Sequence, residues 1–453
     1  MSALWLAVLA LRPPLAPTAY TSEARRALIG AAVSAALPGR AAARSDRDYG
    51  AVPAGPFVFG TPLLGPPRAT VRRELVPGRI WSFEQVQGLI FVHVPVRMTV
   101  IALDGGGLLV YAPIAPTAEC LRLLAEVEAS AGPVLHVLLP SLALEHKAFA
   151  GSFARARPEA QLWVAPGQYS FPVDLPLPAQ GFPQNTRVLP YEGSAEAAAV
   201  PWAAQLPYKV LGPIGGGLNT PKSFTDVVLF DKPTATLLVT DLVVSVPSEP
   251  PAVVRVNDER ALRYHARDTA ADPPLATDEA LAKGWQKICL FSLYFQSSPL
   301  TVSSPPDGTP AGAVRFLKAA FPPMPDEARA LGWRGFWAWS WQPQWRDNFE
   351  ALRMGGAPLV PPIVQCTILN RDPKVTLEFV DAVARDFPFR KIVPAHFEPV
   401  DATPREWCEA FNFLRKTPLG GRGELPDADL AFLRMFEATL VKAGTIPPAL
   451  GKV

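Results

Sequence analysis

"HVLLPSLALEHKAFAG", residues 136–151, is the stretch of sequence that decides the fold. A continuous apolar run ends at Pro140, and Glu145, His146 and Lys147 follow a few residues later. This pattern predicts a buried strand that delivers polar side chains to its carboxyl end, where α/β folds place their chemistry. Glu145 and His146 either belong to a metal site or remain where a site once was.

Two later strands are predicted to end on polar side chains in the same way. Asp241 follows the apolar run "TLLVT", and His396 follows "KIVPA". The chain has only five histidines, so two of them at predicted strand ends single out these positions. Imidazole and carboxylate groups together suit zinc or iron(II). Because several strand ends converge in α/β folds, we expect Glu145, His146, Asp241 and His396 to lie close enough to form one metal site.

The remaining pattern alternates between strand-forming and helix-forming segments. "GLIFVHVPV" and "MTVIAL" predict two short strands broken at Pro95, and "GGGLLVYAPI" predicts a third. "TAECLRLLAEVEAS" has apolar residues at helical spacing, with Thr117 as the predicted N-cap. Later, "SFTDVVLFDKPTATLLVTDLVVSV" predicts two more strands joined by a turn. The sequence therefore predicts a mixed α/β chain.

Composition sets further bounds. The chain has 453 residues, of which 49% are hydrophobic, so it can bury a large core. Lys and Arg number 43 against 41 for Asp and Glu, which gives no electrostatic footprint for nucleic acid. No later segment is long and apolar enough for a transmembrane helix. The cysteines form no CxxC pair and are predicted to be buried free thiols: Cys120, Cys289, Cys366 and Cys408.

Residues 1–43 predict a cleavable presequence. Ala3–Leu11 is an apolar stretch of signal-peptide length, and "APTA" follows it as a small-residue cleavage site. Arg25-Arg26, an apolar stretch and Ala41-Ala42-Ala43 then resemble a twin-arginine export signal. The tandem arrangement resembles the multipart presequences of plastid proteins. It predicts localisation in the plastid (chloroplast), with onward transfer to the thylakoid lumen as one alternative and the stroma as the other.

Three other segments are predicted to lie outside the regular domain. Residues 44–75 are rich in Pro and Gly and predict an irregular leader. Residues 298–325 predict a Pro-rich insertion, and residues 418–453 predict a C-terminal helical extension. The domain itself is thus expected to span residues 76–417.

Further polar residues are pocket candidates. Arg97, Ser141 and Lys147 lie next to predicted strand ends, where the two cations could steer an anionic substrate or compensate Glu145. "YHARD" contributes His265, Arg267 and Asp268, which either line the pocket or, for the last two, form an ion pair on a loop. "WRGFWAWSWQPQWRDNF" predicts an amphipathic helix and loop that cover the sheet, with a ligand-stacking or interaction surface as the alternative.

The sequence resembles the metallo-β-lactamase superfamily and, within it, the DUF4336 proteins of unknown function. The resemblance covers roughly residues 75 to 415 and implies a four-layer αββα sandwich. It is carried by "VPGRIWSFEQVQGLIFVHVPVRMTVIALDGGGLLVYAPIAPTAEC", "LPSLALEHKAFAGSFARARPEAQLWVAPGQYSFP", "LLVTDLVVSVPSEPPAV", "HARD", "GWQKICLFSLYFQ" and "IVPAHFEPV".

The active members of that superfamily carry His-x-His-x-Asp-His after a strand, and the resemblance can be followed along this motif. Ser141 and Ala143 stand where the first two histidines belong, Glu145 takes the Asp position, and His146 is kept. A further histidine expected in a Gly-His-Thr loop is missing from "LGPIGGGLNTPKSF". The resemblance therefore implies that the first of two metal sites has lost its histidines.

The second metal site keeps a ligand type at every position. Asp241 matches the bridging Asp of the superfamily, and His396 matches its late His. The resemblance thus leaves two hypotheses for the function. One is a non-catalytic plastid protein with a binding or assembly role, whose partner is a small molecule or another plastid protein. The other is a hydrolase that uses a single zinc or iron ion to activate water.

Overall fold

The computed structural model of the chain describes residues 46–47, 69–89, 91–170, 174–215, 224–257, 259–303, 309–331, 335–421 and 423–453. The predicted presequence, residues 1–43, lies outside the described residues, as does most of the predicted leader. The last residues of that leader do not fit the prediction, because the first strand begins at Val71 and pairs with the second.

The first sheet has seven strands in sequence order, with antiparallel pairing as far as the fourth strand and parallel pairing thereafter. A parallel neighbour needs a crossover, and helices α3 and α4 provide two of these. The strands are β1 (Val71–Val76), β2 (Ile80–Leu89), β3 (Val92–Ala102), β4 (Leu108–Tyr111), β5 (Val134–Leu139), β6 (Gln161–Val164) and β7 (Arg187–Val188).

The second sheet has five strands in the order β14-β13-β10-β9-β8. Its central strand, β10, is parallel to its neighbour β13, although about 150 residues separate the two strands in the chain. The strands are β8 (Tyr208–Ile214), β9 (Phe224–Asp231), β10 (Thr236–Val239), β13 (Lys391–Pro394) and β14 (Val400–Asp401).

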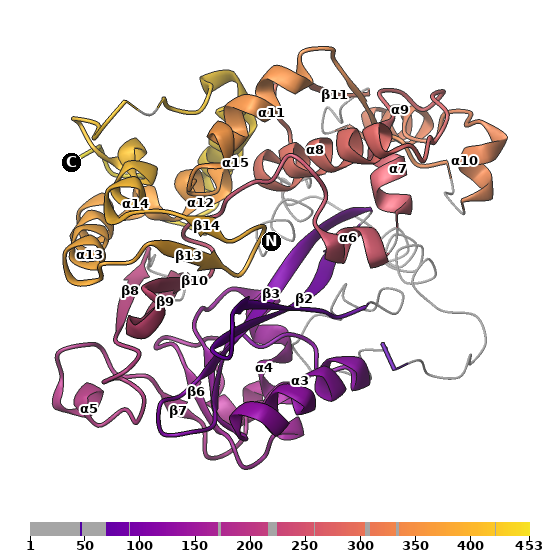
Figure 1. The fold of residues 1–453 in the computed structure, drawn as a ribbon. Helices are drawn as coiled ribbons and strands as arrows, with labels where there is room; N and C mark the ends of the chain where they lie inside the picture. The colour runs from indigo at the N-terminus through magenta and orange to yellow at the C-terminus, as the bar shows by residue number, and fades with distance from the viewer. Residues whose placement is uncertain are drawn as a thin grey trace.

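The two sheets pack face to face with helices on both outer faces, as alternate residues of the strands show. In β5, Leu138 packs in a cluster with Leu238 of the second sheet, while Val137 packs with α3 and α4. In β10, Leu238 faces the first sheet and Leu237 packs in the cluster that contains Val380 of α13. This layering confirms the predicted four-layer αββα sandwich (Figure 1). The covering helices are α3 (Ala118–Ala131), α4 (Leu144–Ala156), α13 (Pro373–Asp386) and α14 (Pro404–Ala410).

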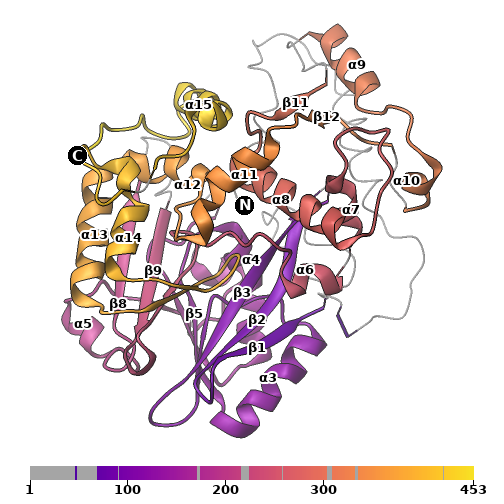
Figure 2. The same ribbon diagram turned by 45° about the horizontal axis from the view of Figure 1, so that its top comes forward.

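A further group of helices lies beyond one end of the strands (Figures 1 and 2). Its centre is α8, which contacts α7, α11, α12 and α15. The last of these lies within the predicted C-terminal helical extension. The remaining elements are α5 (Ala195–Ala198), α6 (Ala252–Asn257), α7 (Arg260–Ala266), α8 (Asp278–Tyr294), β11 (Leu300–Val302), α9 (Pro310–Ala319), α10 (Asp326–Ala330), β12 (Trp339–Trp341), α11 (Trp345–Arg353), α12 (Pro362–Thr367) and α15 (Asp427–Lys442).

The prediction that Pro95 separates two strands was wrong. Residues 92–102 form one strand, β3, in which Pro95 pairs with Val86 of β2. On its other side β3 begins to pair with β4 only at Thr99. The missing N–H of proline therefore costs no ladder hydrogen bond on that free edge. The open edge is instead contacted by the loop that follows β13, since Arg97 N–H donates to Ala395 O.

The Trp-rich segment covers helices rather than the sheet, which corrects the prediction in part. It forms β12 and α11, and α11 packs on α8. The side chains of Trp337, Trp339, Trp341 and Trp345 are buried. Trp337 packs against Trp339, and basic side chains lie over the rings of Trp337, Trp341 and Trp345. These four described tryptophans therefore present no exposed face on which a ligand could stack. The free thiols are confirmed, although Cys408 is only half-buried.

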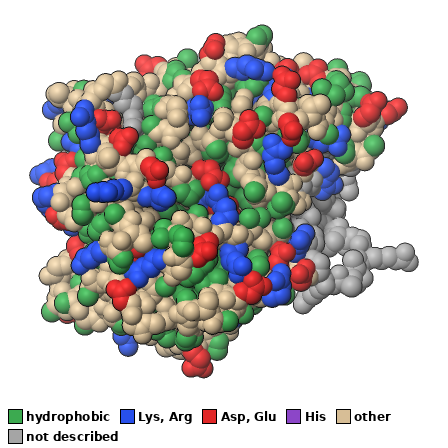
Figure 3. Space-filling model, viewed as in Figure 1, with side chains coloured by type: hydrophobic (Ala, Val, Ile, Leu, Met, Phe, Trp, Pro, Cys, Tyr) green, Lys and Arg blue, Asp and Glu red, His purple; other side chains and the backbone are tan. Residues whose placement is uncertain are grey.

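Acidic and basic side chains are interspersed on the face of the molecule shown in Figure 3. The described residues on this face form no large patch of one charge that could bind a polymer of the opposite charge. Within the described ranges, the structure contains no helix that is both long and apolar enough to cross a membrane.

Close packing of α7 on α8 predicts a strong effect of a small substitution at Gly284. A Cβ at this position would lie 1.9 Å from the carbonyl oxygen of Leu262, and backbone cannot move aside as a flexible side chain can. We expect Gly284→Ala to lower the free energy of unfolding by roughly 1–3 kcal/mol, measured by urea denaturation. Gly105→Ala is the control, because no atom lies within 4 Å of its added Cβ. Equal stability of the two variants would contradict the packing described.

Candidate metal centre

Three strand ends bring His146, Asp241 and His396 together. His146 lies in the first turn of α4, which begins shortly after β5 ends at Leu139. Asp241 follows β10 by two residues, and His396 follows the parallel neighbour β13 by two residues. Because parallel strands end at the same edge of a sheet, Asp241 and His396 meet there. His146 reaches them from the first sheet, which packs face to face on the second.

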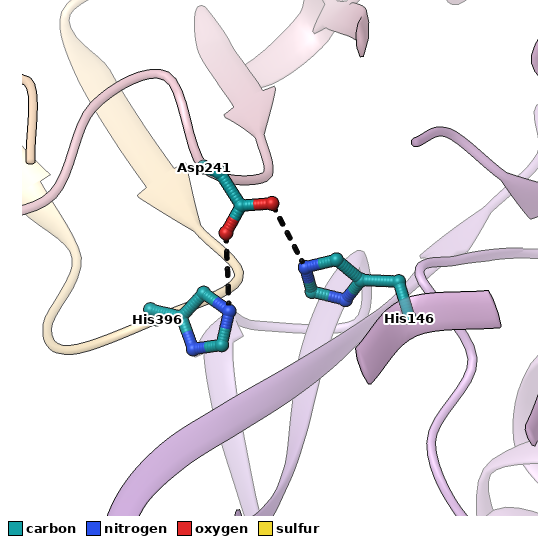
Figure 4. Close-up of side chains that lie close together, drawn as sticks. All are labelled: His146, Asp241 and His396. Atoms are coloured by element: carbon teal, nitrogen blue, oxygen red, sulfur yellow. Dashed lines mark ion pairs between the residues drawn. The ribbon is translucent and has the colours of Figure 1, made fainter. Parts of the chain in front are cut away.

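The Asp241 carboxylate lies between the two imidazoles (Figure 4). His396 Nε2 is 3.2 Å from Asp241 Oδ1, and His146 Nε2 is 3.5 Å from Asp241 Oδ2. One ligand atom from each residue lies within 4.8 Å of the others. Two atoms bound to one zinc ion at about 2.0–2.2 Å are roughly 3.0–3.5 Å apart, so these separations fit a shared ion. Glu145 is not in this group of three, although it borders the same cavity.

The surroundings of the two histidines leave the Nε2 atom of each suited to bind a metal ion. His396 Nδ1 lies 2.8 Å from the carbonyl oxygen of Pro95. A carbonyl only accepts, so Nδ1 carries the proton and a neutral His396 has its lone pair on Nε2. His146 is fully buried, and neither of its ring nitrogens has a hydrogen-bond partner among the described residues. Such a buried unsatisfied nitrogen is costly unless a further ligand completes the site.

Charge couples the three residues strongly. Burial alone would raise the pKa of the Asp241 carboxyl, but the neighbouring His146 and His396 outweigh it and hold that pKa well below its usual value. Burial alone would lower the pKa of His146, and the Asp241 carboxylate reverses this and raises it. The pair therefore stabilises the ionised Asp241, which is the form that ligates metals.

A second buried acid, Asp226, lies behind the cluster on β9. Burial raises the pKa of its carboxyl to about 7. Its Oδ2 accepts a hydrogen bond of 2.5 Å from Thr240 Oγ1, while its Oδ1 has no partner among the described residues. It also lies opposite Ser141 in an isolated bridge between the two segments. Sequence reasoning missed this acid, although an Asp inside the apolar run "FTDVVLF" was a usable signal.

Arg97 fixes the loop that carries His396. Its guanidinium donates to the carbonyl oxygens of Pro394 and Phe397, both at 2.5 Å, on either side of the histidine. Its Nε donates to Glu84 Oε1 at 2.9 Å, and both side chains are 1% exposed. The loop needs such support because Phe397 has a φ of 59°, an unfavourable left-handed conformation for a side chain of this size. Arg97 is therefore a positioning residue, and the prediction that it steers substrate or compensates Glu145 was wrong.

A cavity of about 280 Å³ opens beside the cluster. Glu145, Asp241 and His396 form its polar end, and apolar side chains from α8, α12 and α15 form much of its wall. These helices lie at the end of the sheets in Figure 2 and cover the strand ends that carry the cluster. The cluster is thus accessible to a small ligand while remaining largely shielded from bulk water.

The other pocket candidates do not line this cavity. Ser141 is fully buried and its hydroxyl accepts from Ala143 N–H. Lys147 donates to Tyr169 O and Gln180 Oε1, and burial lowers the pKa of its ammonium group to about 8. Neither side chain faces the Asp241 carboxylate.

The "YHARD" residues also lie elsewhere, beneath the Trp-rich segment. His265 is fully buried and stacks on Trp339, and burial lowers the pKa of its imidazole to about 3. The predicted Arg267–Asp268 ion pair was wrong. Asp268 instead pairs with Lys283 and Lys287, while the Arg267 guanidinium lies 4.3 Å from the ring centre of Trp337. These contacts join α7, α8 and β12 and are structural.

Comparison with protein families identifies the chain. Residues 77–413 match the model of a domain of unknown function, DUF4336. The chain belongs to the DUF4336 family. The match begins one residue after the predicted domain start and ends four residues before its predicted end. Among curated proteins, none matches the sequence significantly.

Solved metallo-β-lactamases are similar to this DUF4336 chain at low sequence identity. DIM-1 metallo-β-lactamase exposed to ceftazidime is 10% identical, with a TM-score of 0.35, and the match covers 76% of this chain and 96% of that one. The metallo-β-lactamase from Hirschia baltica is also 10% identical, with a TM-score of 0.34 and the same coverage. FIM-1 from Pseudomonas aeruginosa, in its mono-zinc form, is 12% identical, with a TM-score of 0.29, over 48% of this chain and 94% of that one. Similarities this low assign no chemistry to the DUF4336 chain.

Loss of the Arg97 guanidinium should destabilise the protein strongly. In Arg97→Met the buried Glu84 carboxylate loses one of its two arginine partners and two buried carbonyls lose their donors. We expect a loss of about 3–5 kcal/mol in the free energy of unfolding, measured by urea denaturation.

The matched control is Arg405→Met, which removes a salt bridge to Glu409 from an arginine that is 77% exposed. Exposed pairs contribute little, so this variant should unfold like the parent protein. A similar small loss in both variants would show that Arg97 does not anchor the His396 loop.

Proposed function

We propose that this DUF4336 protein is a hydrolase that depends on one divalent metal ion held by His146, Asp241 and His396. The observation that carries the proposal is the buried His146 Nε2, which has no hydrogen-bond partner among the described residues and lies 3.5 Å from the Asp241 carboxylate. Two histidines and a carboxylate form a ligand set that suits zinc or iron(II). The open cavity is lined by two of the three residues, Asp241 and His396, and gives a substrate access to them.

The residues around the cluster are arranged to hold such an ion in one geometry. Pro95 O fixes the tautomer of His396, and Arg97 fixes the backbone on both sides of it. When bound, the ion would polarise a substrate carbonyl and lower the pKa of water. The apolar helices that cover the cavity would exclude bulk water and strengthen these electrostatic effects.

A single ion is proposed because ligands for a second one are missing. Ser141 and Ala143 stand where the superfamily pattern has histidines, and the Ser141 hydroxyl is already used within its own loop. The loop without its histidine, residues 211–224, falls largely outside the described residues. The alternative function is a non-catalytic plastid protein with a binding or assembly role. The loss of the histidines of the first metal site favours it.

We also propose the plastid as the compartment, on the sequence of residues 1–43 alone. Fusion of these residues to a fluorescent protein should direct it into plastids, and the Arg25→Lys/Arg26→Lys variant should block any onward transfer to the thylakoid lumen. A cytosolic signal from the fusion would reject this compartment.

Metal content tests the site directly. We expect the purified full chain to contain about one zinc or iron ion, measured by inductively coupled plasma mass spectrometry. His146→Ala, Asp241→Ala and His396→Ala each remove a ligand and should weaken metal affinity at least tenfold, as even outer contacts of metal sites matter by about 10–100-fold. His136→Ala is the matched control, because this histidine lies in β5 away from the cluster.

Activity then separates the two functional candidates. The hydrolase predicts turnover of ester substrates that is lost on chelation and restored by zinc or iron. A protein that binds no metal, or whose metal content is unchanged in His146→Ala and His396→Ala, would reject the proposed centre. Stoichiometric metal without any metal-dependent turnover would favour the binding role instead.

A further inference from the structure

The cavity beside the cluster contains acidic groups but no cationic side chain among its described lining residues. Glu145 and Asp241 supply two carboxyl groups, and neither a lysine nor an arginine borders the space. The two nearby cations have other partners. Arg97 is bound to Glu84 and to backbone carbonyls, and Lys147 is bound to Tyr169 O and Gln180 Oε1. The described lining therefore offers a phosphate or carboxylate group on a ligand no lysine or arginine to pair with.

The rest of the cavity wall is apolar. Six of its members, from β3, from α8, α12 and α15 and from the loop after β13, are Val94, Leu293, Ile363, Phe397, Phe436 and Leu440. The two hydroxyl groups on the wall are occupied within their own helices: Ser292 Oγ donates to Cys289 O and Thr367 Oγ1 donates to Ile363 O. Away from its acidic end the cavity thus offers a ligand apolar contact and few hydrogen bonds.

From this charge and wall composition we infer that the substrate is a neutral carboxylic ester with an aliphatic acyl chain. The chain would lie between α8, α12 and α15, and the ester carbonyl would face Asp241 and His396, which line the cavity. At about 280 Å³ the cavity lies just below the ~300–1,000 Å³ typical of ligand sites, so it fits a short to medium chain rather than a lipid.

The reaction that this arrangement implies is ester hydrolysis with water as the co-reactant. Water adds its oxygen to the carbonyl carbon, and the bond between that carbon and the alkoxy oxygen breaks. One water proton ends on the departing alkoxide, which leaves as the alcohol, and the acid product releases the other to solvent. This inference rests on the proposed metal-dependent function for its chemistry, whereas the ligand class rests on the cavity alone.

Binding to the metal-stripped full chain tests the ligand class without requiring activity. Isothermal titration with 1-octanol and with octanoate compares two eight-carbon chains that differ in charge. We expect 1-octanol to bind at least tenfold more tightly. Leu440→Trp should fill the cavity and weaken octanol binding at least tenfold, while Met435→Trp on the same helix should not, because Met435 is 60% exposed. Ile368→Phe is the second cavity-filling variant, on a half-buried wall residue that tolerates a change more readily.

The metal-loaded full chain tests the chemistry. The value of kcat/KM should rise at least tenfold from p-nitrophenyl acetate to p-nitrophenyl octanoate, and p-nitrophenyl phosphate should not be hydrolysed. Octanoate binding as tightly as octanol, or octanol binding unchanged in both cavity-filling variants, would overturn the inferred ligand class. Selective octanol binding by a chain that takes up no metal would support that class and reject the metal-dependent function, so the two failures can be told apart.

Discussion

The Asp241 carboxylate between two buried histidines is the interaction on which the rest of the site depends. A carboxylate removed from water is strongly destabilised unless charge or hydrogen bonds compensate it. Here the compensation comes from His146 on the first sheet's side and from His396 on the second sheet's own edge. The same three side chains therefore close the sandwich at one end and define its polar site. Loss of either histidine would therefore leave the buried Asp241 carboxylate with less compensation.

The Glu84–Arg97 pair extends this constraint into the first sheet. Arg97 lies on the part of β3 that β4 does not cover, so its backbone and side chain are free to contact the loop after β13. The loop in turn presents its histidine with one nitrogen toward Pro95 O and the other toward Asp241. Pro95 and Arg97 thus act together from one strand edge. A proline that looks like a strand breaker in the sequence marks the edge at which the second sheet's loop is anchored.

The sequence was sufficient for the features that local patterns encode. Apolar runs that end before His146, Asp241 and His396 indicated three side chains that lie together, whereas Glu145, predicted to join them, lies outside that group. The resemblance to the metallo-β-lactamase superfamily predicted the four layers. It was insufficient where the partner of a charge is distant in the chain. Arg97 pairs with Glu84 across the β2–β3 ladder, and Asp268 pairs with Lys283 and Lys287 one helix later, although Arg267 is its neighbour. Ion pairs depend on the tertiary structure, and adjacency in the sequence does not predict them.

The charge balance of the cavity ties the metal centre to its ligand. Two carboxyl groups border a space whose described walls contain no lysine or arginine, and His396 beside them directs Nδ1 to Pro95 O and Nε2 to Asp241. An environment of this kind favours a divalent cation, because the cation would add positive charge where the described walls hold no lysine or arginine. Once the cation and the acidic groups balance each other, little net charge remains to attract an anion. The apolar helices that cover the strand ends then select a neutral ligand by contact alone. One arrangement of charges would therefore account both for the proposed metal ion at Asp241 and for the proposed neutrality of the ligand beside it.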